Sequence, residues 1–410
     1  MTSILTVSEI FCPEGGGAER ATYLILKLLA QQGFEITVVT GTDSPAIIPD
    51  IKYYVTGYLK SSDRLTRWTL ARLLATSHAF IKLLKEHDVL YIPLAAYPLI
   101  PIAKKAGLRV VVHLHNYMPV RYSGVKYFFE PDVMSLFKEL RLAIFHEFHV
   151  QKSLLRTLLS PLSLTGYALS KGWLTKADKI ICVSKRQAEI VSKNHPQLAS
   201  KVEVIYNPLP TELMTTKVRK NLNSIPKFLY VGGESYIKGF HVFLCASARF
   251  LSKGNNAEFI LTGCFHDKSE SIIRSLNKKF NNSYKLVGRL RWEKLLEIHS
   301  KIHGLIFPSI CEEPLPFTVM ESMLAGTIPI ASKIGGIPEM VRGTFAERTL
   351  FEVGDADELE SKMGLVVSMS DKQIADVGYA LIGAALKKFN PEIVKRKLLR
   401  VFSNDDSRLK

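Results

Sequence analysis

The chain has 410 residues, of which 47% are hydrophobic and 10% aromatic, and it carries a formal net charge of +16. This length predicts two domains, and the composition excludes a disordered or collagen-like protein. Lysine and arginine are spread along the chain and no nucleic-acid-binding motif occurs, so we expect an anionic small substrate or an anionic membrane surface as the partner, rather than nucleic acid.

The cysteines and the N-terminus bear on the location of the protein. Five cysteines are scattered along the chain and none forms a CxxC pair, which argues against a disulfide scaffold or a zinc ribbon and favours a reducing cytoplasm. The chain begins with a strand-like segment and no basic region precedes it, so we expect no signal peptide. No apolar stretch reaches about 18 residues, so we expect no membrane-spanning helix.

The first half of the chain alternates between strand and helix patterns. Strands are predicted at Ile4–Ser8, Glu35–Val39, Lys52–Val55, Val89–Pro93, Arg109–His115, Lys179–Val183 and Val202–Ile205. Helices are predicted at Ala18–Gln31, Leu65–Lys85, Leu99–Ala106 and Arg186–Lys193. Such alternation is typical of a mainly parallel sheet with helices on both faces, which binds ligands at the carboxyl ends of its strands.

A second alternating series follows a segment with three prolines at 207–226. Its strands are predicted at Phe228–Val231, Glu258–Leu261, Lys285–Val287, Gly304–Phe307, Ile328–Ala331 and Leu350–Val353. Its helices are predicted at Phe240–Ser252, Lys268–Asn277, Trp292–His299, Phe317–Ala325 and Ala356–Val367. We therefore expect a first domain over 1–207, a linker over 208–226, a second domain over 227–390, and a last helix over 391–410 that packs back on the first domain.

A segment at about 117–175 interrupts the first series. It is rich in leucine, aromatic and basic residues, as in FKELRLAIFHEFHV, and it has a helical pattern. Two interpretations stay open: extra helices packed on the first domain, or a surface that contacts a membrane or a lipid-bearing acceptor. His146 and His149 lie three residues apart here, but no carboxylate or cysteine completes a metal site, so we predict no metal.

The motif CPEGGGAER lies between the first predicted strand and helix. Gly15, Gly16 and Gly17 let the backbone approach a ligand without a Cβ in the way. The amides and dipole of the following helix favour a phosphate or a sugar oxygen. A tight structural turn explains the same three glycines equally well.

Two glutamates with seven residues between them occur in EEPLPFTVMESMLAGTIPIASKIGGIPEMV. The proline pair after Glu313 favours a helix start near Phe317, so Glu313 is predicted in the loop before the helix and Glu321 on its second turn. A carboxylate in this loop can accept hydrogen bonds from sugar hydroxyls, the amides of Thr318 and Val319 face a diphosphate, and a carboxylate one turn deeper can bind a ribose.

These motifs resemble the group 1 family, the family 4 retaining glycosyltransferases of the GT-B fold. The segment with the two glutamates is similar to the signature of that family, and further matches follow in the family's order: GGGAER, VVVHLHNY, ADKIICVSKRQ, VEVIYNP, YVGGESYIKGF, LVGRL and LFEVGDADELESKM. The resemblance covers nearly the whole chain except 117–175. It implies an α/β protein with two facing Rossmann-like domains and a nucleotide-sugar site in the cleft between them.

The resemblance also implies the roles of individual residues. Glu313 would bind the hydroxyls of the donor sugar, Lys238 would neutralise the diphosphate of the leaving group, and His115 would be the histidine of the active site. Since side chains alternate along a strand, His113 and His115 point to one face, and both stay candidates. The nucleotide-sugar-binding set would be Gly15, Gly16, Gly17, Gly233, Arg289, Thr318, Val319 and Glu321.

Two positions depart from the pattern of the family. Many relatives have an arginine beside the diphosphate where this chain has Gly233, and the usual glycine after the first glutamate is here Pro316, which has no amide hydrogen. The loss of a charge-assisted hydrogen bond costs about 1.5–3 kcal/mol, so either another cation replaces the arginine or activity is reduced.

The resemblance implies a retaining, metal-independent hexosyltransferase that uses a nucleotide diphosphate sugar as a substrate and needs no cofactor. We expect it to act on a lipid-linked or glycan acceptor in the cytoplasm, with an anionic membrane surface as a further candidate partner. Two alternatives stay open: a non-catalytic partner of an active glycosyltransferase, and a GT-B epimerase that acts on the nucleotide sugar itself.

Overall fold

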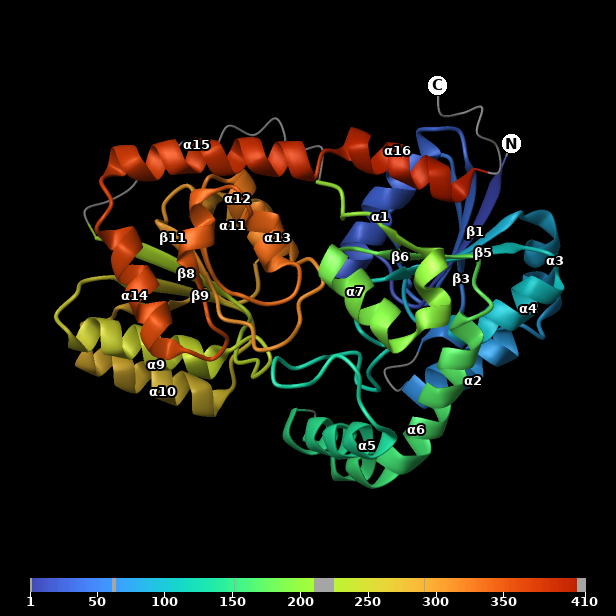
Figure 1. Ribbon diagram of the computed structural model, residues 1–410, viewed down its shortest axis with the longest axis horizontal. Coiled ribbons are helices and arrows are strands. Elements are labelled where there is room, and N and C mark those ends of the chain that lie inside the picture. Colours follow the sequence, from blue (N-terminus) through green and yellow to red (C-terminus); the bar gives the residue numbers. More distant parts are fainter. Residues whose placement is uncertain (1, 61–63, 151, 210–224, 291, 404–410) are drawn as a thin grey trace. The chain divides into compact units, whose positions relative to one another are not determined.

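The computed structural model describes residues 2–60, 64–150, 152–209, 225–290 and 292–403. The chain forms two compact units, each built around one parallel sheet (Figure 1). The first comprises Met1–Lys126, Glu130–Pro210 and Phe389–Lys410, and the second comprises Tyr127–Phe129 and Thr211–Lys388. Most of the linker predicted at 208–226 lies outside the described residues.

The sheet of the first unit has seven parallel strands in the order β3-β2-β1-β4-β5-β6-β7. The strands are β1 (Ser3–Ser8), β2 (Glu35–Thr40), β3 (Ile51–Val55), β4 (Val89–Ile92), β5 (Arg109–Leu114), β6 (Lys179–Cys182) and β7 (Val202–Val204). The central strands are apolar and buried, as parallel strands covered on both faces must be. The predicted parallel sheet is therefore confirmed.

Helices cover both faces of this sheet and bury two separate apolar clusters. The helices are α1 (Gly17–Ala30), α2 (Arg64–Leu74), α3 (His78–Glu86), α4 (Ile100–Lys105), α7 (Lys185–Asn194) and α16 (Pro391–Phe402). Helix α16 lies along α1 (Figure 1), and its Leu398 and Phe402 are fully buried in the same cluster as β1.

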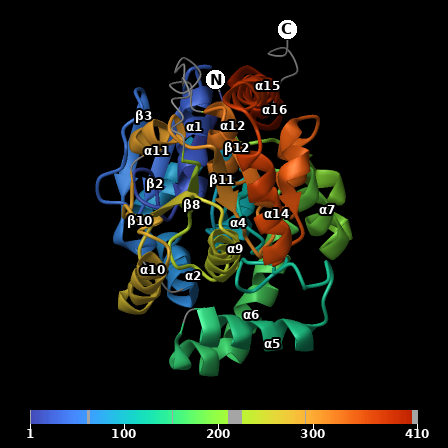
Figure 2. The same cartoon turned by 90° about the vertical axis from the view of Figure 1, so that its left-hand side faces the viewer.

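The segment at 117–175 forms a helical hairpin, defined here as 133–174. It contains α5 (Leu136–Phe145), the π-helical turn η3 (His146–Val150) and α6 (Leu154–Leu174). Helices α5 and α6 lie side by side (Figures 1 and 2), and the last part of α6 approaches α4. The helical character predicted for the segment is present, and the contacts of the hairpin with the rest of the first unit involve only part of it.

The sheet of the second unit has six parallel strands in the order β10-β9-β8-β11-β12-β13. They are β8 (Lys227–Val231), β9 (Glu258–Thr262), β10 (Tyr284–Leu286), β11 (Gly304–Phe307), β12 (Ile328–Ser332) and β13 (Leu350–Phe351). The helices are α9 (Phe240–Ser252), α10 (Asp267–Lys279), α11 (Trp292–His299), α12 (Phe317–Leu324), α13 (Ile337–Val341), α14 (Ala356–Val367) and α15 (Asp371–Lys388).

Two predictions about helices were wrong or incomplete. The single helix predicted at Leu65–Lys85 is two helices, because the hydroxyl of Ser77 accepts a hydrogen bond from the amide of Phe80 and begins a new helix. Helix α15 was not predicted. It packs on α12 through a close approach of Gly378 and Gly326, which local periodicity does not reveal.

Candidate active site

Four loops meet at the carboxyl edge of the sheet in the second unit. Hydrogen bonds tie them together: the amide of Gly233 donates to the carbonyl of Thr262 (2.9 Å), Gly263 to Gly288 (2.9 Å) and Ile310 to Ile237 (3.0 Å). The loops that follow β8, β9, β10 and β11 are thus adjacent. Ligands of parallel sheets bind at this edge.

Lys238 and Glu313 form an ion pair at this edge. The ammonium of Lys238 donates to Oε1 of Glu313 at 2.6 Å, and the hydroxyl of Ser309 donates to the same oxygen at 2.8 Å. The thiol of Cys311 lies 3.6 Å from that oxygen. The Glu313 side chain is 10% exposed and that of Lys238 is 35% exposed, so the cation is the more accessible partner. The sequence did not indicate Ser309 or Cys311, although both lie in the loop that leads to Glu313.

Opposing effects set the charge of Lys238. Desolvation lowers the pKa of Lys238, but the charge of the Glu313 carboxylate and its hydrogen bond more than offset this, so that the pKa lies above its ordinary value. The thiol of Cys311 is buried, and burial with Glu313 beside it raises its pKa to about 12. At neutral pH the cluster therefore presents one cation and no thiolate.

The N-terminus of α12 follows this cluster directly. Helix α12 begins at Phe317, as predicted, and no side chain of the described residues caps it. The amides of Thr318 and Val319 have no intrahelical acceptor, and such amides attract an anion. Glu321 is buried on the second turn, 9% exposed, which is the predicted place in the helix.

Arg289 lies in the loop after β10, and its side chain is exposed. Its neighbour Gly288 accepts the hydrogen bond from Gly263, so this loop reaches the edge of the site. An acid that the sequence analysis overlooked, Glu234, follows Gly233. The carboxylate of Glu234 accepts a hydrogen bond from the amide of His266 and contacts the imidazole of the same residue. These interactions, the amide hydrogen bond most of all, lower the pKa of Glu234 to about 2.

The structure gives a backbone reason for Gly233. Its φ is +58°, and a Cβ at this position would lie 2.8 Å from the carbonyl oxygen of Cys264. A side chain is therefore disfavoured at Gly233 both by the backbone conformation and by the space around it.

Restoring an arginine at this position is thus expected to fail. Gly233→Arg is expected to lower the free energy of unfolding by about 2 kcal/mol or more, since it adds a strained φ and a backbone clash. Equilibrium unfolding in urea measures this, with Gly254→Arg as the control, because Gly254 also has positive φ but no atom within 4 Å of its Cβ position. Higher donor affinity at unchanged stability would contradict the expectation.

The glycine loop of the first unit leads into α1. Gly17 is the first residue of α1, Gly16 is its N-cap and Gly15 has φ +86°. The amide of Gly16 donates to the carboxylate of Glu19 at 2.7 Å, so an anion bound there would compete with Glu19. This hydrogen bond is one half of a capping box, the half in which the carboxylate at the third helical residue accepts from the amide of the N-cap residue.

His113 and His115 lie on the same face of β5 and its extension, as alternation along a strand predicts. Their ring centroids are 4.2 Å apart, and a hydrogen bond of 2.8 Å joins Nδ1 of His113 to the hydroxyl of Tyr91. Nε2 of each ring is buried and has no hydrogen-bond partner among the described residues. Burial lowers the pKa of His115 to about 3, and burial with the neighbouring ring places that of His113 well below its ordinary value. Both imidazoles are neutral at physiological pH.

The two histidines are expected to make the protein sensitive to acid. A base whose pKa is lowered in the folded state contributes stability that is complete above the unfolded pKa of about 6.5 and is lost as the pH falls towards the folded pKa. At pH 5 this loss is about 2 kcal/mol for His115. The difference in unfolding free energy between pH 7 and pH 5, measured in guanidinium, should shrink by this amount in His115→Gln. An unchanged difference would show that the imidazole is hydrated.

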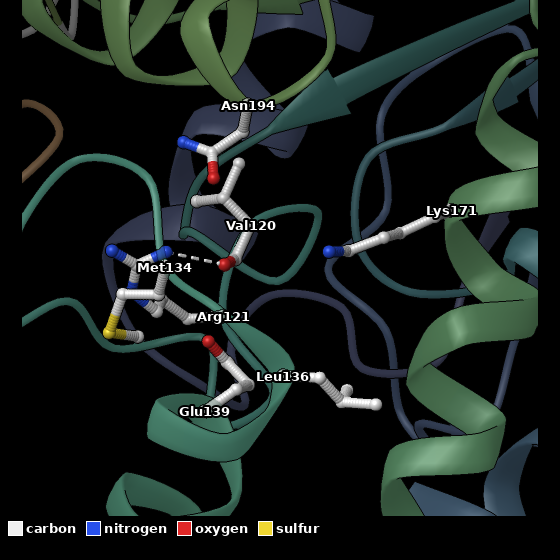
Figure 3. Close-up of a pocket in the computed structure, with 7 residues that line it drawn as sticks. All are labelled: Val120, Arg121, Met134, Leu136, Glu139, Lys171 and Asn194. Carbon is white, nitrogen blue, oxygen red and sulfur yellow. Dashed lines mark hydrogen bonds between the residues drawn. The ribbon is translucent and has the colours of Figure 1, made fainter.

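Within the described ranges, no group of three or more His, Cys, Asp and Glu side chains is arranged to hold a metal ion. A pocket lies at the base of the hairpin (Figure 3), lined by Val120, Arg121, Met134, Leu136, Glu139, Lys171 and Asn194. None of the predicted site residues lines it.

Comparisons with known proteins agree with the two units. The model of glycosyltransferase family 4 matches residues 15–213, and the model of glycosyl transferases group 1 matches residues 215–379. Among curated proteins, the gpi3 subunit of phosphatidylinositol N-acetylglucosaminyltransferase from Schizosaccharomyces pombe is 22% identical over 232 residues, 54% of this chain and 49% of that protein. Alpha-maltose-1-phosphate synthase of Mycolicibacterium smegmatis is 25% identical over 227 residues, 50% of this chain and 57% of that protein. The chain thus spans about half the length of these relatives.

Solved structures share the whole architecture. HepE (Alr3699) of Anabaena, in complex with UDP and glucose, has a TM-score of 0.67 at 18% identity and covers 99% of this chain and 100% of its own. Sucrose-phosphate synthase of Thermosynechococcus elongatus has a TM-score of 0.71 at 15% identity, with 98% of both chains covered. The α/β GT-B fold with two Rossmann-like domains is thereby confirmed. With both of its units matched by family models, the chain belongs to the group 1 glycosyltransferases.

Proposed function

We propose that this protein transfers a hexosyl residue from a nucleotide diphosphate sugar to a lipid-linked or glycan acceptor, with retention of the anomeric configuration and without a metal ion. The observation that carries the proposal is the Lys238–Glu313 pair beside the uncapped N-terminus of α12. An accessible cation and first-turn amides are the groups that a departing diphosphate needs.

The reaction would use these groups in fixed roles. The bond between the anomeric carbon and the diphosphate oxygen breaks as the oxygen of the acceptor hydroxyl bonds to that carbon, and the proton of this hydroxyl passes to the departing diphosphate. Lys238 and the amides of Thr318 and Val319 would stabilise the negative charge that develops on the leaving group. Glu313, held by Ser309, would orient the hydroxyls of the sugar. His115 is neutral, so it can exchange hydrogen bonds with a sugar hydroxyl but adds no positive charge.

Two relatives support the substrates. The HepE structure contains UDP and glucose, which supports a nucleoside diphosphate donor. A matched relative is named for transfer of N-acetylglucosamine to phosphatidylinositol, which supports a lipid-linked acceptor.

A thermal-shift screen of nucleotide sugars tests the proposal. A ligand that binds the folded state raises stability by about 2.7 kcal/mol at a hundred times its Kd, so the cognate donor should raise the melting temperature by several degrees. The nucleoside diphosphate alone should stabilise less than the donor does. If neither nucleotide sugars nor nucleoside diphosphates shift the melting temperature, the proposed donor site is wrong.

The role of Glu321 has its own test. Glu321→Ala is expected to weaken binding of the cognate nucleoside diphosphate roughly ten-fold or more, because charge-assisted hydrogen bonds to the ribose are lost. Isothermal titration measures this. Glu360→Ala is the control, because Glu360 is also buried on a helix of the second unit, at 8% exposure, but on α14. Equal affinity in the Glu321→Ala protein would remove Glu321 from the site.

A further inference from the structure

Helix α6 buries Leu164 and Leu174 but exposes most of its other leucines. Its Ser160 and Ser170 are fully buried, whereas Leu158 is 79% exposed. The hydroxyl of Ser160 donates to the carbonyl of Arg156, so the helix itself satisfies this buried group. The exposed leucines of α6 are Leu154, Leu155, Leu158, Leu159, Leu162 and Leu169. Their spacing places them along one strip of the helix.

Helix α5 and the π-helical turn add to this apolar surface. Leu136 and Phe137 are each more than two-thirds exposed, and Ile144 and Phe148 follow at helical spacing. Helices α5 and α6 are in contact, so both strips belong to one hairpin (Figure 2). Soluble monomers seldom expose so many large apolar side chains together, and such patches mark contact surfaces.

The charges of the hairpin have one sign on its outside. Between 133 and 170, the exposed charged side chains are Lys138, Arg141 and Lys152, all basic. The acidic residues are buried: Glu139 accepts a hydrogen bond from the amide of Tyr122 (2.6 Å), and Glu147 from the Tyr122 hydroxyl (3.3 Å). The hairpin thus presents leucines and cations together.

At the base of the hairpin, in contrast to its outer surface, positive and negative side chains are equal in number. In the pocket of Figure 3, Lys171 from α6 and Glu139 from α5 point into the same space beside Arg121, which pairs with Glu130 at 2.6 Å. Burial lowers the pKa of Lys171 and raises that of Glu139, and the opposite charge of each moderates the other. Two cations face two carboxylates here, so the unbalanced positive charge lies on the outer surface.

We propose that this hairpin lies in the surface of an anionic lipid bilayer, with the leucines of α6 among the acyl chains and Lys138, Arg141 and Lys152 at the phosphates. Of the helices that the structure describes, none has the length and apolarity that crossing a bilayer requires. Apolar side chains flanked by cations are typical of helices that lie in the interface. A symmetric contact with a second copy would instead bring like charges together, which is unfavourable.

Sedimentation of the full chain with vesicles tests the proposal. The protein should bind vesicles with about a third phosphatidylglycerol, bind phosphatidylcholine vesicles far less, and release in high salt. Lys138→Ala with Arg141→Ala should weaken binding about 30-fold, at roughly 5-fold for each cation. Lys105→Ala with Lys278→Ala removes two exposed lysines outside the hairpin and should change binding little.

The leucines are tested in the same way. Leu155→Gln, Leu158→Gln and Leu162→Gln together should weaken vesicle binding by at least about 100-fold. Ile47→Gln, Ile272→Gln and Tyr379→Gln together are the control, because these exposed apolar residues lie outside the hairpin. Equal binding of wild type and the leucine variant, or no binding to anionic vesicles, would overturn the proposal. So would a dimer in solution that the leucine substitutions dissociate, without vesicle binding.

The membrane contact of the hairpin does not depend on the proposed reaction. Vesicle binding needs no donor, and donor titration of the leucine variant should match that of wild type. Vesicle binding without any nucleotide-sugar binding would overturn the reaction and leave the membrane contact supported.

Discussion

Lys238→Ala is expected to lower the rate of sugar transfer on the order of 10²-fold or more. Lys238 is the cation at the Glu313 carboxylate, and Gly233 has no room for the arginine that many relatives carry. Lysine binds a diphosphate as a point charge, without the bidentate contacts that arginine makes. Because no arginine stands at position 233, no such contacts would replace those of Lys238 when it is lost. Steady-state transfer with the cognate donor measures the effect.

A second lysine of the same unit, on the strand that leads into the loop of Lys238, provides the control. Lys227 begins β8 and pairs with Glu258 at 3.2 Å, at the amino edge of the sheet. Lys227→Ala removes a comparable ion pair but should leave the transfer rate within about two-fold, because this pair lies at the edge of the sheet opposite to the one that binds ligands. Unfolding in urea of both variants separates loss of structure from loss of chemistry. A Lys238→Ala protein with near wild-type turnover would mean that other groups hold the diphosphate.

The alternation of strands and helices was sufficient to predict both sheets, because buried parallel strands are short apolar runs that stand out from amphipathic helices. The same reasoning failed between α2 and α3. The helical pattern of the sequence is continuous there, but the hydroxyl of Ser77 caps the start of a second helix. The reasoning also missed α15, whose place depends on a contact of Gly378 with Gly326 that is distant in the sequence.

The positions of the site residues along the helices and loops were predictable where a strand end or a motif of the family fixed them. Glu313, Thr318, Val319 and Glu321 lie where the proline pair and the helix start put them. The burial of His113 and of the Nε2 atom of His115 was not predictable, because it depends on contacts between segments that are distant in the sequence. The need for glycine at position 233 was not predictable either, because the sequence alone does not give the backbone φ of this residue.

Gly335→Ala is expected to disrupt the site from a position that touches no substrate. Gly335 has φ +60°, and a Cβ there would lie 2.1 Å from the carbonyl oxygen of Glu313. The neighbouring amide of Gly336 donates to that same carbonyl at 2.8 Å, so this loop holds the backbone of Glu313 in place. We expect the free energy of unfolding to fall by about 3 kcal/mol, since a strained φ and a clash with backbone add.

Gly343→Ala separates these two causes. Gly343 also has positive φ, +78°, but no atom lies within 4 Å of its Cβ position, so this variant should lose only about 1 kcal/mol. Because displacement of a catalytic group by about 1 Å can cost 10²-fold in rate, Gly335→Ala should also reduce transfer far more than Gly343→Ala does. Unfolding in urea and transfer at a temperature where both variants are folded measure the two effects. If the variants behave alike in both, Glu313 does not depend on the loop after β12, and its carboxylate is positioned by Ser309 and Lys238 alone.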